Sequence, residues 1–233
     1  MGGWRDMSAE ALEQQYSPSR WSPRLGSDTI IQAHIAATAA GTQRARAGAE
    51  TSLHVPYGAG EGERLDIYYP TEPSGTFPAL VYIHGGYWQC LSKDESGFAA
   101  PPLVSRGVAV VAVGYDTAPR GAVLVSGVYD LEPILHTYVN DALNMSREVA
   151  QRNSPVLCVA PAPAACEVLV AVAQHDSPEF RRQSREYGQA LRAAGWNVSL
   201  LDLAGVDHFD IIEKLSEESY VLTQMILNMV SRA

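Results

Sequence analysis

Short apolar runs recur along the chain, and polar or glycine-rich residues follow each of them. Residues 77–83, 107–113, 122–126 and 166–173 carry almost no charge and are rich in β-branched side chains. Continuous runs of this kind are typical of parallel strands that are buried on both faces. Residues 197–203 alternate between polar and apolar positions, which predicts a further strand.

Helical patterns separate these runs. Ser27 or Asp28 can cap a helix that continues to about Gly48, and Ser177-Pro178-Glu179 opens a helix that closes near Gly195. Strands that alternate with helices predict an α/β fold with a mostly parallel sheet, in one domain over residues 1–233. The remaining predicted elements are a short helix within residues 8–25, an antiparallel edge hairpin from residues 52–56 and 64–69, a helix over 141–152, a loop over 154–166 and an amphipathic helix from Phe209 onward.

The connection at residues 114–121 is too short to join two neighbouring parallel strands. It joins two runs that both read as buried parallel strands, and it contains Pro119. Adjacent parallel strands need a crossover of at least roughly 10–12 residues, usually with a helix. The two strands therefore form a hairpin, which burial on both faces disfavours, or a segment that normally lies between them is absent.

Composition narrows the classes of function. The chain has 233 residues, 46% of them hydrophobic, which suffices for one large core. A formal net charge of −9 disfavours nucleic acids and anionic membrane surfaces as partners. The sequence has no apolar signal-peptide core near Met1 and no apolar stretch near the ~20 residues of a membrane span. Three cysteines without framework spacing suit a reducing compartment, so we expect an intracellular protein.

Three features follow predicted strands, where open parallel sheets bind their ligands. His84-Gly85-Gly86-Tyr87-Trp88 comes directly after residues 77–83, and paired glycines can turn the backbone so that N–H groups face a substrate, as an oxyanion hole requires. Asp176 ends another run, and His208 lies between the last strand and the last helix. An acid followed by a histidine in these loops is the chain order of α/β-hydrolase triads.

Each feature also has a plainer interpretation. The His84–Trp88 segment is then a glycine-rich turn with a packed aromatic pair, Asp176 is a helix cap that competes with Ser177, and His208 is a solvated loop histidine. A metal site from Asp176, His208 and Asp210 is a further alternative, but no helical His–Glu pair or cysteine supports it.

The nucleophile of such a triad is missing from the sequence. A Gly-x-Ser-x-Gly elbow, or the same pattern with cysteine, does not occur in the 233 residues. Ser126 ends a predicted strand but lacks the glycine two positions earlier that relieves the strain of the elbow. Cys90 follows the His-Gly-Gly turn, a place for oxyanion donors rather than for an attacking group. Ser126 and Cys90 stay open as recruited nucleophiles of an esterase.

The sequence resembles the kynurenine formamidase (arylformamidase) branch of the α/β-hydrolases over nearly its whole length. The segments that carry the resemblance are Tyr16-Ser17-Pro18-Ser19-Arg20-Trp21, the His84–Trp88 turn, residues 126–134, Asp176-Ser177-Pro178-Glu179-Phe180 and Val206-Asp207-His208-Phe209. The resemblance implies hydrolysis of N-formyl-L-kynurenine to L-kynurenine and formate in tryptophan catabolism, without a cofactor, in the cytosol or nucleus. It also implies that Asp176 is the triad acid, His208 the general base, and His84, Gly85, Gly86, Tyr87 and Trp88 the oxyanion-hole element.

The sequence departs from this family at one place. Where members carry a helix, a central strand, the serine elbow and a second helix, this chain has only Pro119-Arg120-Gly121. Average element lengths put the missing segment at roughly 50–70 residues, absent between about Arg120 and Ala122. We therefore predict an internally deleted, catalytically impaired chain.

Loss of such a segment also bears on folding. Removing ~600 Å² of apolar burial costs roughly 15 kcal/mol, which equals or exceeds the ~5–15 kcal/mol by which whole proteins are stable. We therefore predict a poorly folded chain. A non-catalytic binding or interaction module stays open as an alternative function, and so does a homodimer.

Overall fold

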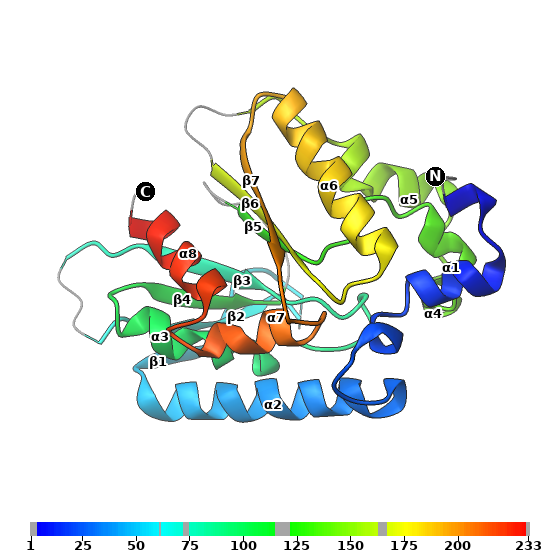
Figure 1. Cartoon of the computed structure of the whole chain (residues 1–233). Helices are drawn as coiled ribbons and strands as arrows, with labels where there is room; N and C mark the ends of the chain where they lie inside the picture. Colours follow the sequence, from blue (N-terminus) through cyan, green and yellow to red (C-terminus); the bar gives the residue numbers. More distant parts are fainter. Residues whose placement is uncertain (1–3, 61, 72–74, 115–121, 163–166, 232–233) are drawn as a thin grey trace. The chain divides into compact units, whose positions relative to one another are not determined.

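The computed structural model describes residues 4–60, 62–71, 75–114, 122–162 and 167–231 (Figure 1). The predicted joint at Pro119–Gly121 lies outside these ranges. The described residues form two compact units, and each is described by itself. The first unit combines residues 1–30 with 120–211, and the second combines residues 31–119 with 212–233. The prediction of a single domain stays a prediction.

The first unit is built on a three-stranded parallel sheet in the order β5-β6-β7. Its strands are β5 (Ala122–Val125), β6 (Glu167–Ala173) and β7 (Asn197–Leu203), and β6 is buried along almost its whole length. Helix α6 (Pro178–Ala193) packs along β6 and β7 (Figure 1). The apolar residues at the centre of this layer are Val168, Val170, Leu191 and Val198.

Short helices complete the first unit. They are η1 (Trp4–Asp6), α1 (Ala9–Gln15), η2 (Pro18–Trp21), η5 (Pro133–His136), α4 (Val139–Leu143), α5 (Arg147–Asn153) and η6 (Pro155–Leu157). The prediction of one helix over residues 141–152 was wrong, because Asn144 adopts a left-handed conformation with φ of 46° and ends α4. Ser146 then caps α5 by accepting a hydrogen bond from the Val149 amide.

The second unit is built on a four-stranded mixed sheet in the order β1-β2-β4-β3. Its strands are β1 (Thr51–Pro56), β2 (Arg64–Tyr68), β3 (Ala79–Ile83) and β4 (Ala109–Val113). The hairpin β1–β2 is antiparallel and lies at the edge of the sheet, as predicted, and β3 pairs with β4 in parallel. The prediction that β3 is buried on both faces was wrong. It is the other edge of this sheet, and Val81 and Ile83 are 37% and 49% exposed.

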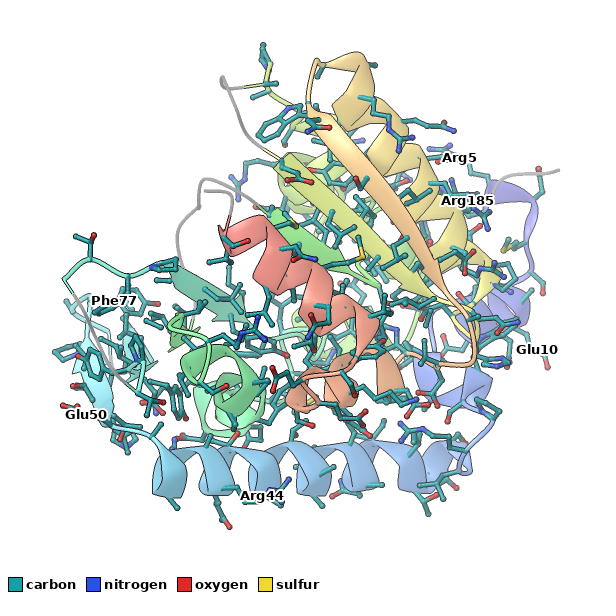
Figure 2. The ribbon with its side chains drawn as sticks, turned by 60° about the vertical axis from the view of Figure 1, so that its left-hand side comes forward. Arg5, Glu10, Arg44, Glu50, Phe77 and Arg185 are labelled. Carbon is teal, nitrogen blue, oxygen red and sulfur yellow. The ribbon has the colours of Figure 1, made fainter. Side chains whose placement is uncertain are left out.

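Helices of the second unit include α2 (Ser27–Gly48), which begins in the first unit, η3 (Lys93–Glu95), η4 (Gly97–Ala99), α3 (Ala100–Val104), η7 (Lys214–Ser216) and α8 (Val221–Ser231). Arg44 lies on the exposed face of α2 (Figure 2), whereas Thr42 faces inward and accepts a hydrogen bond from the Gly97 amide. The terminal helix predicted from Phe209 onward is interrupted. After α7 (Asp210–Glu213) and η7, Glu217 is extended, and α8 begins only at Val221.

The α/β character of the chain is confirmed, but its strands form two sheets rather than one. Strands β4 and β5, which the short connection joins, do not pair with each other in the described residues. The hairpin interpretation of that connection is therefore wrong. Within the described ranges no helix has the length and apolar character needed to cross a membrane.

Candidate active site

Asp176 lies just beyond the carboxyl end of β6, at the start of α6. Ser177 caps this helix, because its hydroxyl accepts a hydrogen bond from the Phe180 amide, and Pro178 occupies the first turn. The interpretation of Asp176 as the helix cap is therefore wrong. Asp176 is 4% exposed, and its carboxylate is hydrogen-bonded to other partners.

Three groups hold the Asp176 carboxylate. One oxygen, Oδ1, lies 2.7 Å from Nδ1 of His208, and the other, Oδ2, accepts hydrogen bonds from Ser126 Oγ at 2.5 Å and from the Ala173 amide at 2.9 Å. The structure thus brings together the predicted acid and base, which are 32 positions apart in the sequence. Both belong to the first unit.

The surroundings of the Asp176 carboxyl favour its ionised form. Burial alone would raise the pKa of Asp176, but the charge and hydrogen bond of His208 and the hydrogen bonds from Ser126 and Ala173 lower it overall. An ionised carboxylate only accepts hydrogen bonds, so Nδ1 of His208 carries the proton. The opposite ring nitrogen, Nε2, is then the basic one, which is the tautomer that a triad requires.

Ser126 is bonded to the acid rather than to the base. Its backbone is left-handed, with φ of 45°, and its amide donates to the Ala171 carbonyl at 2.8 Å, which extends the β5–β6 ladder by one bond. Its hydroxyl is buried against Asp176. A serine nucleophile must give its proton to the histidine, so this geometry disfavours Ser126 as a recruited nucleophile.

Asp207, the residue before His208, is a completely buried carboxylate. Its Oδ1 accepts hydrogen bonds from the amides of Phe209 at 2.9 Å and Asp210 at 2.8 Å, and Arg24 and Ser22 donate to the same carboxylate. Burial alone would raise the pKa of Asp207, but the hydrogen bonds from Arg24, the Asp210 amide and Ser22 outweigh it and lower the pKa to about 2. The loop that carries His208 is therefore anchored by an ionised side chain.

Asp207→Asn is expected to cost about 2–3 kcal/mol of unfolding free energy at pH 7, since the pKa of this carboxyl falls from about 3.9 in the unfolded chain to about 2. Because the folded-state pKa is depressed, the stabilisation is present above about pH 4 and is lost as the pH falls toward 2. Urea unfolding across this pH range, for the parent and the variant, measures it.

The matched control is Asp202→Asn, which removes an exposed partner of Arg181 in the same unit. Its effect should stay within about 1 kcal/mol. A free-energy difference between the parent and Asp207→Asn that does not change with pH would contradict the anchoring role of Asp207.

The predicted oxyanion element, His84–Trp88, follows β3 in the second unit and forms a tight turn there. Gly86 has φ of 107°, and a Cβ at this position would collide with the carbonyl oxygen of Cys90, so only glycine fits. Tyr87 and Trp88 are also left-handed, with φ of 50° and 58°, and Trp88 is 53% exposed. Its indole is thus not a packed core side chain.

Cys90, the second candidate for a recruited nucleophile, lies at the end of this turn. Partial burial of the thiol and the nearby Glu95 carboxylate both raise its pKa. A raised pKa keeps the thiol protonated, whereas a nucleophilic cysteine needs a lowered one. The environment of Cys90 therefore disfavours that role.

The metal alternative finds no support in the described ranges. They contain no group of three or more His, Cys, Asp or Glu side chains that could hold an ion. Asp210, the third residue of that alternative, is instead paired with Arg24, whose guanidinium lies 3.1 Å from its Oδ1.

Relatives of the chain decide its family. It is 44% identical to the kynurenine formamidase of Danio rerio, in an alignment of 293 positions that covers all of both chains. The kynurenine formamidase of Salmo salar is also 44% identical over the whole of both chains, and that of Drosophila melanogaster is 25% identical over 76% of this chain and 80% of the fly protein. The chain belongs to the kynurenine formamidase family.

Solved structures agree on the fold. A thioesterase-type protein from Silicibacter sp. superposes with a TM-score of 0.75 at 19% identity, covering 94% of this chain and 98% of that one. An esterase from Pyrobaculum calidifontis gives 0.62 at 16% identity, covering 96% and 97%. The predicted α/β-hydrolase-like fold is confirmed, with sheets flanked by helices. No family model matches the chain.

Two residues of the site have roles that sequence reasoning missed. Ser126 was considered only as a nucleophile, although its place at the end of β5, next to the end of β6, is the signal for a contact with Asp176. Asp207 was noted only as the neighbour of His208. No local pattern could have paired Asp207 with Arg24, because 183 positions separate the two residues.

Proposed function

We propose that this chain is a kynurenine formamidase scaffold for N-formyl-L-kynurenine hydrolysis that has lost its nucleophile segment, and that its catalysis is impaired. Asp176 and His208 are the acid and base of the triad, and the His84–Trp88 turn is an oxyanion-hole element. The segment that would carry the serine is absent between about Arg120 and Ala122.

The observation that carries the proposal is the combination of an assembled acid–base pair with two interrupted sheets. The Asp176–His208 pair has the hydrogen bond that a triad needs between its acid and its base, and the pKa of Asp176 is lowered, which favours its ionised form. However, β3 is an edge strand of one sheet, and β5 is an edge strand of the other. In a relative with a complete sheet, one further strand between these two edges would join both sheets into one. The nucleophile strand of α/β-hydrolases is such a central strand.

The alignment with the Danio rerio protein supports the size of the missing segment. It extends over 293 positions, whereas this chain has 233 residues, so 60 alignment positions have no residue of this chain. Two helices, one strand and their loops amount to roughly 50–70 residues. The number of unmatched positions falls within this range, which supports the proposed deletion.

In the complete enzyme, the residues of this chain would act on the proton and the developing charge. His208 Nε2 would take the serine proton, while Asp176 holds the ring and stabilises the imidazolium. The serine would attack the formyl carbon, and N–H groups near Gly85 and Gly86 would bind the oxyanion. His208 would then return the proton to the departing aniline nitrogen of kynurenine, and a water molecule would release formate.

The alternative is a chain that binds an aromatic ligand or another subunit without catalysis. A fluorophosphonate labels activated serines covalently. It should label this chain only if the chain is an esterase with a recruited serine, and not if the main proposal or the non-catalytic alternative holds. We expect the probe to label the Danio rerio enzyme and not this chain, because the Ser126 hydroxyl is bonded to Asp176.

Ser126→Ala is the control for any labelling that does occur. Labelling of the parent that disappears in this variant, together with N-formyl-L-kynurenine turnover, would contradict the proposal and establish Ser126 as a nucleophile. Labelling that persists in Ser126→Ala would exclude Ser126 and direct attention to another residue.

We propose a cytosolic or nuclear location from the family resemblance and from the three cysteines without framework spacing. The net charge of −9 supports a small-molecule substrate rather than a nucleic acid.

A further inference from the structure

The segment after α1 is a family-like motif that the proposed chemistry does not use. In the structure, this N-terminal segment packs in the same unit as the acid–base pair. The Tyr16 hydroxyl donates to Glu179 Oε2 at 3.1 Å and accepts from Gln183 Nε2 at 2.7 Å, and its ring lies 6.1 Å from the ring of Phe180. Phe180 in turn lies edge-on to His208, with ring centroids 5.1 Å apart. The N-terminal segment thus reaches the base through one intervening ring.

A second, polar connection leads from this segment to the loop of His208. Ser22 Oγ donates to Asp207 Oδ2 at 2.5 Å, Arg24 Nε donates to the same oxygen at 3.0 Å, and Arg24 Nη2 donates to Oδ1 at 3.3 Å. Arg24 Nη1 also pairs with Asp210 at 3.1 Å. Arg24 therefore binds the carboxylates on both sides of His208 in the sequence.

We propose that Arg24 and Ser22 are positioning residues for the base. They hold Asp207, and Asp207 holds the amides of Phe209 and Asp210, so the loop keeps Nδ1 of His208 on Asp176. This inference rests on the proposed function only for the role of His208. Bidentate hydrogen bonds from arginine fix both distance and orientation, which a lysine or a neutral side chain cannot do equally well.

A role for Arg24 in binding a substrate carboxylate fits the contacts less well. Its side chain is 31% exposed, and its guanidinium already pairs with two carboxylates, one of them completely buried. A third anion would have to compete with an Asp207 carboxylate that cannot leave. Arg24 is thus engaged with the protein itself.

The test uses a signal that does not depend on turnover. A proton held between an imidazole and a buried carboxylate resonates far downfield in proton NMR and exchanges slowly with water. Loss of this signal in Asp176→Asn assigns it to His208. In Arg24→Met we expect the proton to exchange about tenfold faster with water. This corresponds to a loss of about 1.4 kcal/mol in the stability of the state in which the hydrogen bond between His208 and Asp176 is formed. The exchange rate in Arg24→Lys should lie between the rate in Arg24→Met and the rate in the parent.

Arg5→Met is the matched control. Arg5, labelled in Figure 2, is 69% exposed and pairs with Glu132 in the same unit, so its removal should leave the exchange rate unchanged. Exchange in Arg24→Met within twofold of the parent would overturn the proposal, as would equal effects of Arg24→Met and Arg5→Met. Where Arg24→Met fails to give a folded amide spectrum, Ser22→Ala decides, since it removes the hydroxyl that donates to Asp207 and accepts from the Arg24 amide, and it leaves both ion pairs of Arg24.

A second readout separates this inference from the proposed function. The second readout uses this chain with the nucleophile segment of the Danio rerio enzyme inserted, the protein described in the Discussion. In that protein, Arg24→Met should lower kcat by about 10²-fold with KM unchanged, as expected for a displaced base. An inserted chain without activity would contradict the proposed function, while the NMR comparison would still decide the role of Arg24.

Discussion

Insertion of the nucleophile segment that we propose to be absent, taken from Danio rerio kynurenine formamidase and placed between Arg120 and Ala122, is expected to raise kcat for N-formyl-L-kynurenine by about 10⁶-fold. This is roughly the loss in a comparable triad enzyme when the nucleophilic serine alone is removed. The insertion supplies the serine and the amide that follows it, an oxyanion donor. The proposed acid and base, Asp176 and His208, already lie within hydrogen-bond distance of each other, so the insertion does not have to bring them together.

Steady-state production of kynurenine measures this effect, with the uninserted chain and the Danio rerio enzyme alongside. The matched control is the same insertion with its elbow serine changed to alanine, which should return kcat to the level of the uninserted chain. His208→Ala should do the same, and Asp176→Asn should cost about 10⁴-fold. An inserted chain whose activity survives His208→Ala would show that this histidine is not the base. Turnover of the uninserted chain within tenfold of the relative would refute the impaired-catalysis proposal.

The second large effect concerns stability and association. Each unit has its own sheet and buried core, so we expect the chain to fold but to unfold at low urea concentration. Insertion should raise the free energy of unfolding by several kcal/mol, up to roughly 15 kcal/mol if ~600 Å² of apolar surface is buried. Urea titrations followed by near-UV circular dichroism compare the two. A cooperative transition of the uninserted chain that matches that of the inserted one would contradict this expectation.

The uninserted chain is also expected to self-associate through β3. This edge strand carries no charged side chain, and its Val81 and Ile83 are exposed, a combination that favours pairing with another strand edge. Val81→Lys should therefore shift sedimentation toward the monomer. Leu200→Lys is the matched control, because Leu200 is 38% exposed on β7, an edge strand of the other sheet. Equal effects of the two lysines would exclude β3 as the cause.

Local pattern predicted most elements of this fold. Strands β4, β5 and β6 lie within the apolar runs predicted at residues 107–113, 122–126 and 166–173, and α6 begins at Pro178, because these signals act between residues close in the sequence. Where prediction failed, a local conformation or a position at the edge of a sheet decided the result. Asn144 in a left-handed conformation divided one predicted helix into two. The exposure of β3 follows from its position at a sheet edge, which its own apolar sequence does not reveal.

In the candidate site, too, some features follow from the sequence and others only from the tertiary structure. The sequence by itself determined the family, the missing elbow, the short connection and the candidates Asp176 and His208, since chain order and strand-end position are properties of the sequence. Only the tertiary structure decided that Ser126 is bonded to the acid, that Ser177 caps α6, and that Arg24 holds Asp207. These contacts join residues up to 183 positions apart or depend on which of two neighbouring side chains takes a hydrogen bond. Such choices are made by packing, and no local pattern encodes them.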